Sequence, residues 1–254
     1  MMVPESDADA LAVGRKPFAI LTALLAAPPR DDPALARLMR GGGRNGDGPA
    51  PVLLTPATLP AAVAARFDCG VDLLNEGLRK DAAGRPPPAH GLPRCAFVLM
   101  VGDRPAGYFS LRGRTIRCVA PAGGGTAGAA AGTDDATGAD GGVPIVVLSR
   151  LAVDRRDQGS GLGAVLLREA LLCAVNLSEG GRRHDAPEDA PGGRFAARAV
   201  FVHALDAAVR PFYLRHGLRA APAILDPLGV LVTMPELGWA GAEGVKAATR
   251  RAGG

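Results

Sequence analysis

The chain has 254 residues and a net charge of +4; 48% of its residues are hydrophobic and only 4% aromatic. This length allows one or two domains with a sizeable core, and the mildly basic balance permits a polyanionic partner without requiring one. The four cysteines form no CxxC-type pair, which argues against a zinc site and indicates scattered thiols in a reducing compartment: Cys69, Cys95, Cys118 and Cys173.

An apolar run at residues 17–28 follows Arg15 and Lys16 and faintly resembles a signal peptide. Acidic residues precede it, which is wrong for a signal peptide, and the run is too short to span a membrane. We therefore expect residues 1–51 to be a partly disordered N-terminal extension. The protein is expected to be cytoplasmic, with no membrane partner.

Four stretches rich in Gly, Ala, Pro or polar residues interrupt the chain, at residues 41–51, 82–93, 121–142 and 180–193. Such segments cannot bury enough apolar surface to offset their ordering entropy. They are predicted to be solvated low-complexity loops inserted into one domain at residues 52–238, followed by a tail at residues 239–254.

Between these loops the hydrophobic periodicity predicts regular elements. In chain order they are a strand at 52–54, a helix at 68–80, strands at 95–101 and 106–119 joined by a turn, a long strand at 145–153, a helix at 164–177, a strand at 199–203, a helix at 206–216 and a last strand at 229–234. Asp68 or Gly70 is expected to cap the first helix and Asp206 the last. The order predicts an α/β domain.

A glycine-rich turn between the strand at 145–153 and the next helix carries the chemistry. Gly159, Gly161 and Gly163 alternate with other residues at the start of the helix. Glycine lets a ligand approach the backbone closely, and the first amides of a helix favour an anion, so the turn predicts a phosphate or pyrophosphate site. Neither the Rossmann nor the P-loop spacing is present, and a turn without a ligand is the alternative.

Residues 158–163 fit the pattern [Q/R]-x-x-G-x-[G/A], and here the chain resembles the GNAT acetyltransferases. The resemblance implies a mixed, largely antiparallel central sheet flanked by helices, with acetyl-CoA as co-substrate and no metal. It also implies that the strand before the turn holds the pantetheine arm. The residues that this resemblance assigns to the cofactor are Leu151, Ala152, Val153, Gln158, Gly159, Ser160, Gly161, Leu162 and Gly163.

Four shorter matches, at residues 67–70, 107–109, 150–154 and 202–204, are similar to the TacT-like GNAT toxins of bacterial toxin–antitoxin pairs. This resemblance implies acetylation of the aminoacyl group on charged tRNA, which blocks translation. It also allows for a ribbon-helix-helix antitoxin and a homodimer as partners.

The helix at 206–216 looks like the family helix that places a tyrosine near the thioester sulfur, which makes Tyr213 the expected general acid. A phenol with a pKa near ~10 is protonated at neutral pH and can donate to a thiolate. The alternative role for Tyr213 is core packing. Pro211 lies inside the predicted helix and is expected to kink it just before the tyrosine.

A general base is less evident, because the strand at 143–150 carries no carboxylate. The absence favours an α-amine acceptor, whose pKa is near ~8, over a lysine near ~10.4. His203 is interpreted as a strand-end residue and not as a base.

A tRNA acceptor should leave an electrostatic footprint, although each basic residue taken alone is as well explained by a solvated surface. Arg155 or Arg156 could instead serve the CoA phosphates, and the insertion at 121–142 could crowd the acceptor side. The alternatives are a GNAT enzyme acting on a small-molecule amine or a protein N-terminus, a non-catalytic acyl-CoA-binding protein, and a nucleic-acid-binding module. The basic residues expected to contact tRNA are Arg79, Lys80, Arg112, Arg114 and Arg150.

Overall fold

The computed structural model describes residues 24–25, 52–54, 59–83, 94–116, 142–180, 196–222 and 226–238. Apart from residues 24–25, the expected N-terminal extension lies outside the described residues, as do the C-terminal tail and almost all of the four low-complexity loops. None of the described helices is long and apolar enough to cross a membrane.

A seven-stranded sheet in the order β1-β2-β3-β4-β5-β7-β6 forms the centre of the described structure. Every neighbouring pair is antiparallel except β4 and β5, which run parallel. The predicted mixed, largely antiparallel sheet is therefore confirmed. The strands are β1 Val52–Leu54, β2 Arg94–Val101, β3 Arg104–Ile116, β4 Val143–Val153, β5 Ala199–His203, β6 Arg219–Ala220 and β7 Gly229–Thr233.

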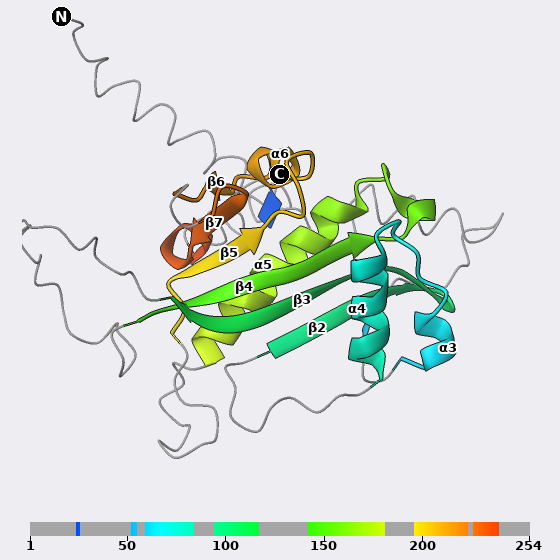
Figure 1. The fold of residues 1–254 in the computed structure, drawn as a ribbon. Helices are drawn as coiled ribbons and strands as arrows, with labels where there is room; N and C mark the ends of the chain where they lie inside the picture. Colours follow the sequence, from blue (N-terminus) through cyan, green and yellow to red (C-terminus); the bar gives the residue numbers. More distant parts are fainter. Residues whose placement is uncertain are drawn as a thin grey trace, which may run out of the picture.

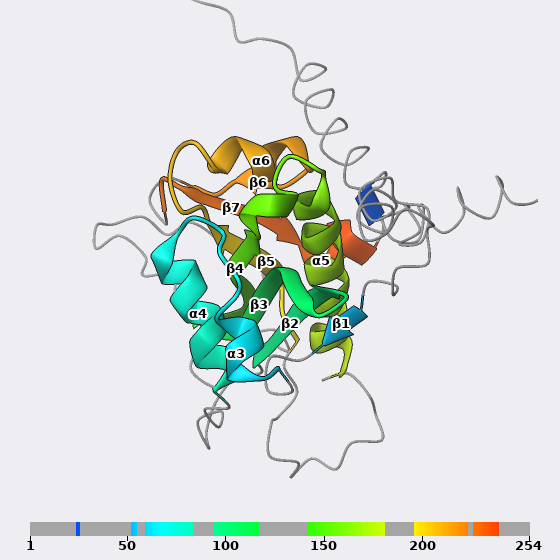
Figure 2. The same cartoon turned by 90° about the vertical axis from the view of Figure 1, so that its right-hand side faces the viewer.

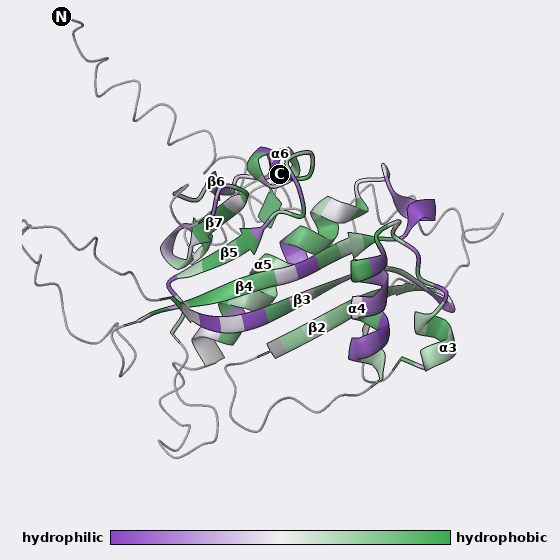
Figure 3. Ribbon diagram, viewed as in Figure 1, coloured by the Kyte–Doolittle hydropathy of each residue, from purple (hydrophilic) through white to green (hydrophobic). Residues whose placement is uncertain are grey.

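Helices cover both faces of the sheet (Figures 1 and 2). α3, Ala61–Ala64, and α4, Asp72–Ala82, lie on one face, and α5, Leu162–Gly180, lies on the other. The sheet and α5 are mostly hydrophobic, whereas α4 carries hydrophilic residues (Figure 3). This distribution matches the burial, because Leu166 and Leu171 of α5 and Leu78 of α4 are fully buried while Arg79 and Lys80 are exposed.

The first predicted helix begins later than expected, and the predicted cap was wrong. Helix α4 starts at Asp72 after Val71, which makes no side-chain capping bond. Gly70 has φ +88°, and the Asp68 carboxylate accepts hydrogen bonds from the Gly70 amide (2.9 Å) and from Asn75 (3.0 Å). Because a left-handed residue cannot continue a helix, residues 68–71 form a separate turn that packs against the rest of the site.

The expected kink at Pro211 was also wrong. Helix α6 spans Arg210–Arg215, and Pro211 lies in its first turn. An amide in the first turn of a helix has no intrahelical acceptor, so proline removes nothing there. Asp206 does cap the turn that leads into α6, since its Oδ1 accepts from the amides of Ala208 and Val209, both at 2.8 Å.

A β-bulge in β4 sets the geometry of the site. In the β3–β4 register Ser110 pairs with Arg150 but Leu111 pairs with Leu148, so Ser149 is an extra residue on β4. Its hydroxyl stays 2.9 Å from that of Ser110. Before the bulge Leu148 packs in the core under α5, whereas beyond it Ala152 packs in the core under α4. The bulge therefore reverses which residues of β4 face each side.

Candidate active site

A cleft opens where β4 and β5 separate. The two strands pair only from Val146 with Val200 to Leu148 with Val202, although β4 continues to Val153. The resulting cleft has a volume of about 510 Å³. Its lining comes from the turn before α4, from α4, from β4, from the glycine turn, and from β5 to α6: Cys69, Val71, Leu73, Leu74, Val147, Leu148, Ser149, Arg150, Leu151, Ala152, Val153, Gln158, His203, Leu205, Val209 and Tyr213.

The end of β4 presents backbone groups to this cleft. Residues 150–153 pair with β3 on one side, but the β5 ladder has already ended on the other. Leu151, Ala152 and Val153, which the family resemblance assigns to the cofactor, all line the cleft. An open strand edge can form hydrogen bonds with an extended ligand that carries amides, as an added strand would.

The glycine turn lies at the end of the same strand. A short 3₁₀ helix, η3 (Arg155–Asp157), leads into it, Gly159 and Gly161 have φ values of +74° and +94°, and α5 begins at Leu162. A Cβ added at Gly159 would meet nothing within 4 Å, so the space beside this backbone is open. At the start of α5 the Ala164 amide donates to the Gly161 carbonyl at 3.0 Å and the Leu162 amide donates to Ser160 Oγ at 3.4 Å. A glycine turn at a helix start can bind an anion through the backbone amides that remain.

Gly163 has a different role from the other two glycines. A Cβ at this position would lie 3.4 Å from the ring of Phe212 in α6. A side chain there would contact α6, which carries Tyr213 next to Phe212, at about van der Waals distance. Of the three regularly spaced glycines, Gly159 and Gly161 thus shape the turn through their positive φ values, whereas Gly163 lies where α5 packs against α6.

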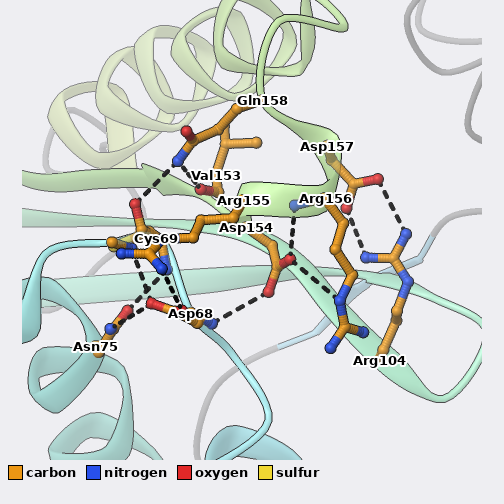
Figure 4. Close-up of polar contacts among 11 residues, drawn as sticks. Asp68, Cys69, Asn75, Arg104, Val153, Asp154, Arg155, Arg156, Asp157 and Gln158 are labelled. Carbon is orange, nitrogen blue, oxygen red and sulfur yellow. Dashed lines mark hydrogen bonds and ion pairs between the residues drawn. The ribbon is translucent and has the colours of Figure 1, made fainter.

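A hydrogen-bond network ties the turn before α4 to the loop after β4 (Figure 4). The buried Asp154 carboxylate accepts from the Asp68 amide at 3.1 Å and from the Arg156 amide at 3.1 Å. The Arg155 amide donates to the Asp68 carbonyl at 2.8 Å, and its guanidinium lies 3.3 Å from the Asp68 carboxylate. The guanidinium that was considered for the CoA phosphates is therefore engaged within the protein.

Gln158 extends this network into the glycine turn. Its side-chain amide donates to the carbonyls of Cys69 (2.9 Å) and Val153 (3.0 Å), as Figure 4 shows. Asp157, one residue earlier, instead receives two bonds from Arg104 in the β2–β3 hairpin, at 2.5 and 2.9 Å. Hydrogen bonds within the protein therefore hold the glycine turn from two sides, through the Gln158 amide and through the Asp157 carboxylate.

Tyr213 reaches the cleft from α6. Its side chain is 5% exposed, and burial raises the pKa of its phenol to about 12. Among the described residues no group forms a hydrogen bond with its hydroxyl. Tyr213 is therefore a protonated donor at neutral pH, on the wall of the cleft and free to bond a ligand.

His203, which the sequence indicated to be a strand-end residue and not a base, also lines the cleft. It lies at the end of β5, and its Nδ1 is hydrogen-bonded to the Asp226 carboxylate. Burial alone would raise the pKa of Asp226, but bonds from His203 and the Leu228 amide hold it below its usual range. The partner was not recognisable from the sequence, because Asp226 is 23 residues further along the chain.

The structure separates the five basic residues considered for tRNA. Arg150 lines the cleft, where its Nη1 donates to Asp81 at 3.0 Å and its guanidinium packs over Gly77. The other four do not line the cleft as far as the described residues define it. Arg79 is exposed on α4, Lys80 pairs with Glu76 at 2.9 Å, Arg112 is half-buried and Arg114 is exposed on β3.

Apolar side chains flank the mouth of the cleft. Leu73 of α4 is 66% exposed and Leu205, just after β5, is 44% exposed; they are the exposed large hydrophobic residues of the described chain. Both line the cleft, from opposite walls.

Among the described lining residues none carries a carboxylate, so a cationic group entering the cleft meets no counter-ion there.

No protein-family model matches the chain. A tRNA-acetylating toxin from Mycobacterium tuberculosis (strain ATCC 25618 / H37Rv) is 36% identical to it over 94 residues, which are 37% of this chain and 47% of the relative. The chain thus spans about half the length of the curated relative that it matches.

Solved structures share the fold. A crystal structure of AtaTR bound with AcCoA matches with a TM-score of 0.53 at 20% identity, over 74% of this chain and 95% of the other. A KacTA–DNA complex matches with a TM-score of 0.51 at 20% identity, over 74% and 96%. The resemblance drawn from the sequence motifs is confirmed: this chain has a GNAT-like fold and resembles the TacT-like toxins of that superfamily.

Proposed function

We propose that this protein is an acetyl-CoA-dependent N-acetyltransferase that acetylates the α-amine of aminoacyl-tRNA. The observation that carries the proposal is the cleft between β4 and β5, which is lined by the end of β4, by Gln158 at the start of the glycine turn, and by Tyr213. The 36% identity to a tRNA-acetylating toxin supports the same activity.

The cleft fits the parts of acetyl-CoA in order. The open edge of β4 at residues 151–153 suits the two amides of the pantetheine arm. The amides around Gly159 and Gly161, which follow the lining residue Gln158, would suit the pyrophosphate. The thioester would then lie near the bulge at Ser149, within the same cleft as Tyr213. The tyrosine would protonate the leaving thiolate.

The acceptor is the finer part of the proposal. The lack of a carboxylate among the described lining residues suits an α-amine, which loses its proton more readily than a lysine. Arg112 and Arg114 lie on the sheet face opposite α5, where α4 carries Arg79 and Lys80, and this face would attract the phosphates of tRNA. Such an enzyme would act in the cytoplasm and would need an antitoxin partner.

The test is incubation of the protein with labelled acetyl-CoA and total charged tRNA, followed by mass analysis of the aminoacyl adducts. We expect N-acetylated aminoacyl groups, and no label on uncharged tRNA or on formylmethionyl-tRNA, whose amine is blocked. Label on free amines or protein N-termini alone would overturn the tRNA acceptor. Binding of acetyl-CoA without any turnover would identify an acyl-CoA-binding protein instead.

A further inference from the structure

The point where β4 and β5 separate carries an imidazole that the acetyltransferase chemistry can use. Leu148 and Val202 are the last paired residues, so His203 is the first residue of β5 beyond the ladder, beside the bulged Ser149. It is in the cleft that we propose to hold the thioester. We propose, on the basis of the function proposed above, that His203 is the general base that deprotonates the acceptor amine and that Asp226 is its positioning residue.

The hydrogen bond to Asp226 fixes which ring nitrogen is available. An ionised carboxylate can only accept, so Nδ1 carries the proton and donates to Asp226. In the neutral ring the lone pair is then on Nε2. Asp226 is itself held by the Leu228 amide at 2.8 Å, and its side chain is only 14% exposed. The tautomer and the orientation of His203 are therefore set before a ligand enters.

The other polar groups on the cleft offer no basic lone pair. The Arg150 guanidinium has donors only. Burial raises the pKa of the Cys69 thiol and raises that of Tyr213 to about 12, so both already carry their protons. Among the described residues that line the cleft, His203 is thus the one side chain with a basic nitrogen lone pair.

The acid and the base belong to different sides of the sheet. Val200 and Val202 pack in the core under α5, so the alternation of β5 turns His203 toward the opposite face. Tyr213 instead packs with the α5 core cluster. An amine arriving over the α4 face would meet the imidazole, while the thioester sulfur would meet the phenol.

The proton balance of this step is complete. His203 Nε2 takes one proton from the ammonium form of the acceptor, and the neutral amine nitrogen then attacks the thioester carbonyl carbon and forms the C–N bond. The second proton that this nitrogen loses goes to water. The C–S bond breaks, and the CoA sulfur takes the phenolic proton of Tyr213. The imidazolium then returns a proton to the tyrosinate through water, which leaves an amide, a thiol and both side chains in their starting states.

The test compares His203→Gln, His203→Ala and Asp226→Asn with the wild type in acetyl transfer between pH 6 and pH 9. The matched control is His216→Gln, since His216 bonds the Phe212 carbonyl at 2.7 Å and does not line the cleft. We expect His203→Gln to lower kcat by about 100-fold at pH 7 with KM for acetyl-CoA little changed. Its deficit should shrink above about pH 8, where the α-amine loses its proton unaided.

Two further readouts separate base catalysis from a structural role. Added imidazole should raise the acetyl-transfer rate of His203→Ala by at least about tenfold. Asp226→Asn should lower kcat less than His203→Gln does, by about tenfold, with the same dependence on pH. A deficit that is independent of pH and not rescued by imidazole, or variants that equal the wild type, would overturn the inference alone. A wild-type protein that transfers acetyl to no amine would overturn the proposed function as well.

Discussion

The two walls of the cleft are built in opposite ways. On the β4 wall the side chains of Asp154 and Gln158 form hydrogen bonds with other groups of the protein and so hold the glycine turn against residues 68–69. On the β5 wall the Tyr213 hydroxyl has no partner among the described residues, and His203 is bonded through one nitrogen only. Under the proposed function, the β4 wall would hold the cofactor in a fixed place and the β5 wall would react with it.

The largest effect is expected from the reactive wall, at Tyr213. Tyr213→Phe removes the proposed acid and should lower kcat by about 100- to 10,000-fold while acetyl-CoA binding is retained. Steady-state kinetics and calorimetry would measure the two quantities. The chain has one other tyrosine, Tyr108, whose hydroxyl donates to the Leu74 carbonyl at 2.6 Å. Tyr108→Phe should reduce stability and leave kcat near the wild-type value; equal kinetic losses in both variants would refute the assignment.

The β4 wall can be tested by a substitution in the glycine turn. Gly159→Ala adds a methyl group into open space, so its effect comes from the left-handed backbone at φ +74°. An L-residue there costs roughly 1–2 kcal/mol. If the free variant relaxes the turn and acetyl-CoA requires the original geometry, the same cost lowers the affinity for acetyl-CoA roughly 5- to 30-fold. Calorimetric titration would measure it. Gly238→Ala, which also meets nothing within 4 Å, is the control and should bind normally. Unchanged affinity of Gly159→Ala would show that the turn does not hold the cofactor.

The attachment of the 68–71 turn offers a finer test of the same wall. Asp154 and Asp157 are both buried and three residues apart, yet Asp154 holds Asp68 whereas Asp157 holds Arg104. Asp154→Asn should raise KM for the acceptor several-fold, because one wall of the cleft loses an anchor. Both variants should lower the melting temperature by a similar amount, but Asp157→Asn should leave KM for the acceptor unchanged. If both variants change KM alike, the effect belongs to general destabilisation.

The smallest expected effect is on stability at alkaline pH. The pKa of Tyr213 is raised to about 12, so the unfolded chain, with an ordinary value near ~10, releases this proton first as pH rises. The contribution of the buried neutral phenol to the free energy of unfolding is fully present below about pH 10. It declines between about pH 10 and pH 12, and the loss at pH 10.5 is less than about 1 kcal/mol. Denaturant unfolding should show a shallower decline in Tyr213→Phe. A decline of unchanged slope would mean that the phenol is not buried in solution.

Much of the arrangement could be read from local patterns. Alternation and apolar runs located β2, β4, β5, β7 and α5 to within a few residues, since these elements depend on which side chains are buried. The two-residue β6 and the one-turn α3 were missed, because segments of this length carry no period. The start of α4 was missed because a left-handed glycine and an Asp68 turn replaced the expected cap.

The sequence by itself determined the glycine turn and the presence of a helix that carries Tyr213, because both depend on residues close together in the chain: glycines at the start of one helix, and Asp206 as a cap before the other. Only the tertiary structure decided what surrounds them. The bulge at Ser149, the early end of the β4–β5 ladder and the pairing of His203 with Asp226 join segments that are remote in sequence. Such pairings follow from strand register and packing, which no local pattern encodes.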